Sequence, residues 1–150
     1  MSVVDFSKLY PDNRQEGETV LRQAQLVMLR MLKIIDYICR KHDISYWMCS
    51  GTLLGAVRHK GFIPWDDDLD IGMPRADYDL LIANAKEWLP EPYEAVCAEN
   101  DKEYPLPFAK VQDANTTLIE RMHLKYLGGV YIDIFPPVSY THLRAHETRH

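Results

Sequence analysis

The chain has 150 residues, of which 47% are hydrophobic and 26% charged, and its formal net charge at pH 7 is −5. This composition is typical of a globular domain with its own core, and the acidic balance argues against a nucleic-acid-binding protein. No apolar run is long enough for a transmembrane segment, and the first residues do not resemble a secretory signal. Widely spaced cysteines without a zinc-ligand pattern favour reduced thiols in a cytoplasmic protein; they are Cys39, Cys49 and Cys97.

Hydrophobic periodicity predicts two substantial helices. After a loose polar lead-in at residues 1–14, apolar residues recur every three or four positions, with polar residues such as Gln25 between them, and predict a helix over 16–41. Pro74 suits the first turn of a second helix over 76–89. Short apolar runs bounded by turn residues predict a small helix and six strands. The small helix covers 53–58, and the strands cover 44–49, 69–73, 93–98, 108–112, 116–120 and 130–135. This mixture predicts an α+β domain.

The last residues, 138–150, differ in character from the apolar strand before them. His142, His146 and His150 are spaced by four and would share one helix face, as in a metal site. We reject this interpretation because the run resembles the translation of a sequencing-library adapter; a natural tail is the alternative. We therefore expect one domain over 15–137, a non-native tail after it, and a natural protein longer than this chain.

Four aspartates lie within five residues, at positions 66, 67, 68 and 70. Carboxylates this close repel one another, so a fold that holds them together needs a cation or strong donors nearby. In a strand, Asp68 and Asp70 would project to one face and could bind a hard divalent cation such as Mg²⁺. Asp66 and Asp67 are either outer ligands or simple loop charges.

Two further segments suit the same chemistry. Ser50, Gly51 and Thr52 form a small-residue turn before a helix, where backbone N–H groups can approach a phosphate. Asp133 lies alone among apolar residues in the last predicted strand. A third carboxylate beside Asp68 and Asp70 would complete an oxygen site for one or two Mg²⁺ ions of the kind that supports phosphoryl transfer.

The small-residue turn, the Asp-x-Asp pair and the later aspartate resemble the signature of the nucleotidyltransferase fold. The longer motifs at 46–55, 58–70, 108–113 and 132–136 resemble more specifically the LicD family, whose members transfer phosphocholine or phospho-alditols to surface glycans. This resemblance implies a nucleotidyltransferase-like mixed β-sheet flanked by helices. It also implies a CDP-choline-like donor, a glycan acceptor, release of CMP, and a cytoplasmic location that includes the inner face of the membrane.

The resemblance also implies roles for individual residues. Asp68 and Asp70 would ligate Mg²⁺ or Mn²⁺, and Asp133 would be the third ligand or the base that activates the acceptor hydroxyl. The implied substrate-binding residues are Ser50, Gly51 and Thr52 at the nucleotide phosphates, Arg58 and Lys110 at the diphosphate, and Trp65 beside the acidic run.

Three alternatives stay open at this stage. The same carboxylates would serve nucleotidyl transfer from an NTP onto a small acceptor, and the domain could instead bind a nucleotide without turnover. For Trp65, the attraction of an aromatic face for a quaternary ammonium group competes with simple core packing.

Overall fold

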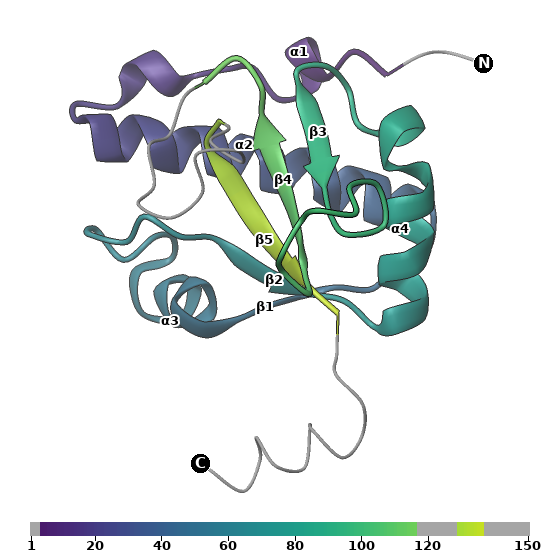
Figure 1. Ribbon diagram of the computed structural model, residues 1–150. Coiled ribbons are helices and arrows are strands. Elements are labelled where there is room, and N and C mark those ends of the chain that lie inside the picture. Colours follow the sequence, from purple (N-terminus) through teal and green to yellow (C-terminus); the bar gives the residue numbers. More distant parts are fainter. Residues whose placement is uncertain (1–3, 117–128, 137–150) are drawn as a thin grey trace, which may run out of the picture.

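The computed structural model describes residues 4–116 and 129–136. This part combines helices with a mixed five-stranded sheet, so the predicted α+β class is confirmed (Figure 1). The tail at 138–150, with its three histidines, and positions 117–120 of the predicted strand at 116–120 lie outside the described residues.

Both long helices form close to their predicted limits, and the small helix is longer than the predicted 53–58. The strand predicted at 108–112 keeps its length with a shift of one residue, and the other described strands are shorter than predicted. The helices are α1 (Phe6–Leu9), α2 (Val20–Lys41), α3 (Ser50–His59) and α4 (Arg75–Trp88), with a 3-10 turn at Arg14–Glu16. The strands are β1 (Trp47–Met48), β2 (Asp70–Gly72), β3 (Tyr93–Val96), β4 (Ala109–Asp113) and β5 (Tyr131–Phe135).

The strand order across the sheet is β1-β2-β5-β4-β3. β2 and β5 run parallel, and the other neighbouring strands are antiparallel. Along β5, Ile132 and Ile134 are buried while Asp133 between them is partly exposed, because successive side chains point to opposite faces. One face of the central strands therefore joins the core, and the other carries polar side chains.

Helix α2 supplies much of the core and crosses behind the strands in Figure 1. It begins at Val20 because the Thr19 side chain caps it, accepting a hydrogen bond of 3.0 Å from the backbone N–H of Arg22. No helix in the described ranges is both long and apolar enough to cross a membrane. The largest fully buried apolar side chains are Met28, Met31, Ile34 and Ile35 of α2 together with Ile71, Met73, Tyr78, Leu81, Val111, Ile132 and Ile134.

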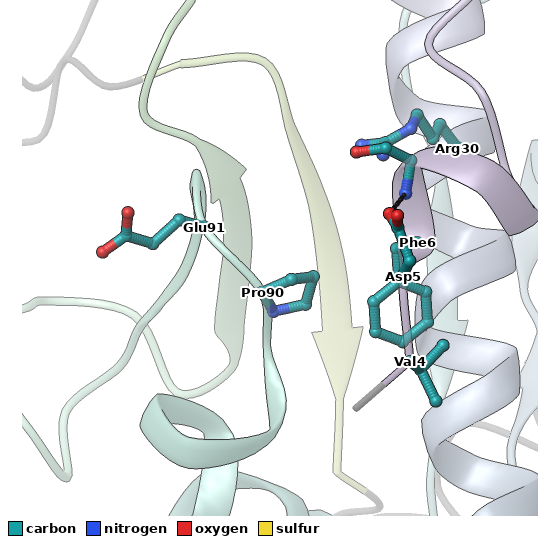
Figure 2. Close-up of a pocket in the computed structure, with 7 residues that line it drawn as sticks. Val4, Asp5, Phe6, Arg30, Pro90 and Glu91 are labelled. Atoms are coloured by element: carbon teal, nitrogen blue, oxygen red, sulfur yellow. Dashed lines mark hydrogen bonds between the residues drawn. The ribbon is translucent and has the colours of Figure 1, made fainter. Parts of the chain in front are cut away.

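The polar lead-in contains a short helix, Phe6–Leu9, and is followed by a 3-10 turn, Arg14–Glu16, neither of which its sequence predicted. Asp5 caps α1 by accepting a hydrogen bond from the Ser7 N–H, and Phe6 packs against the core. Figure 2 shows the hollow beside this segment, with Phe6 from α1, Arg30 from α2 and Pro90 from the turn after α4. The hollow has a volume of about 440 Å³, and none of the predicted site residues lines it.

At Gly55, the backbone of helix α3 packs tightly against the backbone of the loop that follows the helix. A Cβ atom at Gly55 would lie 2.5 Å from the Gly61 carbonyl oxygen and 2.9 Å from the Ile63 nitrogen, and backbone atoms cannot move aside as a side chain can. We expect Gly55→Ala to lower the free energy of unfolding by about 1–3 kcal/mol, although alanine is the better helix former.

Urea denaturation of Gly55→Ala and Gly61→Ala measures this difference. A Cβ at Gly61 meets no atom within 4 Å, so Gly61→Ala is expected to stay within about 0.5 kcal/mol of the parent protein. Equal effects of the two substitutions would show that α3 and its loop do not approach each other in this way.

Candidate active site

The sheet brings three charged side chains from distant parts of the sequence into one row. Asp70 on β2 is in register with Asp133 on β5, which is in register with Lys110 on β4. Lys110 Nζ lies 3.0 Å from Asp133 Oδ1, and the Asp133 carboxylate is close enough to Asp70 to raise the pKa of Asp70. Two of the predicted metal ligands and one predicted phosphate contact are therefore adjacent.

Asp68 lies outside the strand in which the sequence placed it. Strand β2 begins at Asp70, and the Asp68 N–H donates to Asp66 Oδ1 at 3.1 Å instead of pairing with a neighbouring strand. The predicted strand character of Asp68 is thus wrong, although the Asp68 carboxylate still lies close enough to Asp70 to raise the pKa of Asp70. Oxygen atoms of Asp66, Asp67 and Asp68 lie within 4.8 Å of one another, so the acidic run divides into a loop cluster and the strand residue Asp70.

The surroundings of Asp70 favour its neutral form. Its burial, and then the nearby carboxylates of Asp133, Asp68 and Asp66, raise the pKa of Asp70 to about 6. The backbone N–H of Asp70 donates to Thr52 Oγ1 at 2.9 Å, which fixes the start of β2 against α3.

This pKa shift predicts a pH dependence of stability in the absence of divalent cations. The pKa of Asp70 in the folded state, about 6, exceeds the ordinary value of 3.8, so the folded protein binds the proton more tightly. Ionised Asp70 therefore destabilises the fold above pH 6, and that destabilisation is lost as the pH falls from 6 toward 3.8. Because Asp70 is only partly buried, we expect an effect of about 1 kcal/mol.

Urea midpoints in EDTA between about pH 4 and 8 measure this effect, with Asp70→Asn as the matched variant. The stability of Asp70→Asn is expected to lack the decrease that ionisation of Asp70 causes in the parent protein as the pH rises. If the parent protein and the variant gave parallel profiles, the raised pKa of Asp70 would be refuted.

The predicted small-residue turn forms the first turn of α3. Ser50 has a φ angle of 49°, and a Cβ atom at Gly51 would lie 3.0 Å from Asp66 Oδ2. The absence of a side chain at Gly51 thus lets the N-terminus of α3 lie directly against the acidic loop. The N–H of Cys49 also donates to the Asp70 carbonyl at 3.0 Å, which ties this turn to β2.

Gln25 supports the acidic loop from the protein interior, a contribution that the sequence did not predict. Its side chain on α2 is only 2% exposed, and its Nε2 donates to the Asp66 carbonyl oxygen at 2.8 Å. The same amide reaches the carbonyls of Ile63 and Pro64 at 3.4 and 3.3 Å. The periodicity of α2 placed Gln25 among the polar spacers and gave no signal that it is buried.

Two predicted substrate-binding residues stand apart from the row of charged side chains. Arg58 lies in the last turn of α3, about 12 Å along the helix axis from Ser50, and makes no ion pair within the described residues. Trp65 is 77% exposed in the loop before the aspartates, so core packing does not account for it. Trp47, by contrast, covers Gly72 of the neighbouring strand.

Comparison with known proteins identifies the family. The family model described as LicD/FKTN/FKRP, nucleotidyltransferase domain, matches residues 43–149. The chain belongs to the LicD family. The family membership expected from the motifs is thereby confirmed, and every predicted site residue lies within the matched range.

The chain matches only part of the length of its relatives within the LicD family. The chain is 37% identical to "Lipopolysaccharide cholinephosphotransferase LicD" of Haemophilus influenzae over 119 residues, which are 77% of this chain and 43% of that protein. It is 26% identical to "Ribitol-5-phosphate transferase FKTN" of Macaca fascicularis over 134 residues, 87% of this chain and 24% of that protein. With human "Ribitol 5-phosphate transferase FKRP" it shares 53% identity over 30 residues, 20% of this chain and 6% of that protein. The chain therefore spans less than half the length of these relatives.

Proposed function

We propose that the site at Asp70 and Asp133 transfers a phospho-alcohol, such as phosphocholine, from a CDP-activated donor to a hydroxyl group of a cell-surface glycan. The observation that carries this proposal is the row of Asp70, Asp133 and Lys110 beside an acidic loop and the N-terminus of α3. The names of the LicD-family relatives, a cholinephosphotransferase and two ribitol phosphate transferases, support the phospho-alcohol class. The reaction would take place in the cytoplasm or at the inner face of the membrane.

The donor set suits a hard divalent cation, Mg²⁺ or Mn²⁺. Every side-chain ligand it offers is a carboxylate oxygen, which such cations prefer. Asp70 and Asp133 lie close enough together for their charges to repel, and a bound cation would relieve that repulsion. Asp68, Asp70 and Asp133 would hold the cation, with Asp66 and Asp67 close by. When bound, the cation would neutralise the charge of the donor diphosphate.

The chain's own residues would then position the reactants. The N–H groups of the first turn of α3, at Ser50, Gly51 and Thr52, would bind phosphate oxygens. In the role of base, Asp133 would accept the proton of the acceptor hydroxyl. The hydroxyl oxygen would then form its bond to the phosphorus of the phospho-alcohol, and the bond between that phosphorus and CMP would break. The exposed ring of Trp65 would suit a quaternary ammonium group.

Arg58 and Lys110 are the proposed partners of the diphosphate. Of the two, Lys110 lies in the row of charged side chains, where it is paired with Asp133. Arg58 would reach the diphosphate only from the far end of α3. We therefore expect Lys110 to matter more for the donor than Arg58 does.

A donor assay tests the proposed function. With Mg²⁺, CDP-choline and a glycan acceptor, we expect CMP release, and CDP-ribitol as a second donor identifies the alcohol. A CDP-alcohol at about 100 times its Kd is expected to stabilise the fold by about 2.7 kcal/mol.

The same measurements separate the two alternative functions. Stabilisation by NTPs with Mg²⁺, together with pyrophosphate release and no response to CDP-alcohols, would establish nucleotidyl transfer instead. Stabilisation by a nucleotide without any CMP or pyrophosphate release would indicate a binding domain.

A further inference from the structure

The ammonium group of Lys110 is enclosed by groups that stabilise a positive charge. Its Nζ atom lies 3.0 Å from Asp133 Oδ1, 3.5 Å from the centre of the Tyr131 ring and 5.7 Å from the centre of the Phe108 ring. The side chains of Lys110 and Asp133 are only 17% and 14% exposed. Removing one member of a pair this buried leaves the other charge uncompensated. Lys110 is therefore not an ordinary surface lysine.

The Asp133 carboxylate, which is paired with Lys110, is also a ligand of the proposed metal site. The carboxylate of Asp70 lies beside that of Asp133 on the neighbouring strand, so one ammonium group balances a pair of adjacent carboxylates. A divalent cation on Asp133 would come close to the ammonium group and be repelled by it. Lysine has a long, flexible side chain that can move away from such a cation while its backbone stays in β4.

We propose that Lys110 is the internal counter-cation of Asp133 and that a divalent cation takes its place there. Lys110 then acts as a positioning residue: it holds the empty site together, lowers the affinity for the metal, and is released for donor phosphates when the metal binds. The inference rests on the proposed function in one respect, namely that Asp133 is a ligand of the cation.

Substitution of Lys110 tests both halves of the inference. In EDTA, Lys110→Met is expected to lower the Tm by about 5 °C or more, because Asp133 loses its counter-charge. Titration calorimetry with Mn²⁺ is expected to show about tenfold tighter binding to Lys110→Met than to the parent protein. Lys110→Arg keeps the charge and should stay close to the parent in both measurements, as should the surface control Lys86→Met.

An unchanged Tm for Lys110→Met, or Mn²⁺ binding that is unchanged or weaker, would overturn the inference. The second outcome would mean that Lys110 has a purely structural role. A residue that only supports the fold would lower the Tm without strengthening metal binding, so the two measurements together separate these roles.

Acetylation of the parent protein provides a test that needs no variant. In EDTA, Lys110 is expected to react with acetic anhydride several-fold more slowly than the exposed Lys86, and saturating Mn²⁺ should remove most of that protection. Mass spectrometry of the labelled peptides gives the rates. If Mn²⁺ bound and Lys110 still reacted slowly, the replacement of Lys110 by the cation at Asp133 would be refuted, and the proposed function would not be affected. A chain that binds no Mn²⁺ would overturn both.

Discussion

Asp70→Asn is expected to reduce the proposed phospho-alcohol transfer about 1000-fold or more while making the cation-free protein more stable. The loss of activity follows because an amide is a poor ligand for a hard cation and carries no charge to hold it. The gain in stability, about 1 kcal/mol at pH 8, follows because the amide removes an ionised carboxylate that burial and neighbouring aspartates disfavour. CMP release measures the first effect, and urea denaturation in EDTA measures the second.

The opposite signs make this prediction specific to a ligand-binding role. Asp79→Asn on α4 is the matched control, because Asp79 lies in an exposed pair with Arg75, with side chains 55% and 56% exposed. Asp79→Asn should change neither activity nor stability by a measurable amount. If Asp70→Asn lost stability as well as activity, Asp70 would be a structural residue and the proposed metal site would have to be abandoned.

Arg14→Met is expected to lower the free energy of unfolding by about 3–5 kcal/mol. Arg14 Nη2 lies 2.8 Å from Asp113 Oδ2, and the Asp113 side chain is 0% exposed at the end of β4. Without the guanidinium group, Asp113 would be a buried carboxylate whose side chain keeps, among the described residues, only the hydrogen bond from the Asn115 N–H, at 2.9 Å from its Oδ1. Urea denaturation measures the loss.

Two further variants separate the effect of an uncompensated charge on Asp113 from the effect of lost packing around Arg14. Arg75→Met removes two exposed ion pairs, with Asp79 and Glu99, and is expected to cost no more than about 0.5 kcal/mol. The double variant Arg14→Met with Asp113→Asn should recover part of the loss, because it removes the uncompensated charge. If the double variant were less stable than Arg14→Met, the contribution of Arg14 would come from its packing rather than its charge.

The candidate site was predictable wherever its residues belong to a local pattern. Asp133 lies between Ile132 and Ile134 in a run with strand character, and the structure places all three in β5 with alternating burial. The turn at Ser50 and Gly51 was predicted to precede a helix over 53–58; the helix forms, but it begins three residues earlier, so the turn is its first turn. Asp68 was misplaced because its N–H bonds to the side chain of Asp66, a local alternative to strand pairing that the alternating pattern does not reveal.

The sequence by itself determined the family, the α+β class, the two long helices and the identity of the acidic residues, because periodicity and motifs act over a few neighbouring positions. Only the tertiary structure decided which charges meet. The pairing of Lys110 with Asp133 depends on the register of β4 and β5, and that of Arg14 with Asp113 joins residues 99 positions apart. Such contacts form only when segments distant in the sequence pack together and exclude water. The spacing of residues along the chain therefore does not predict them.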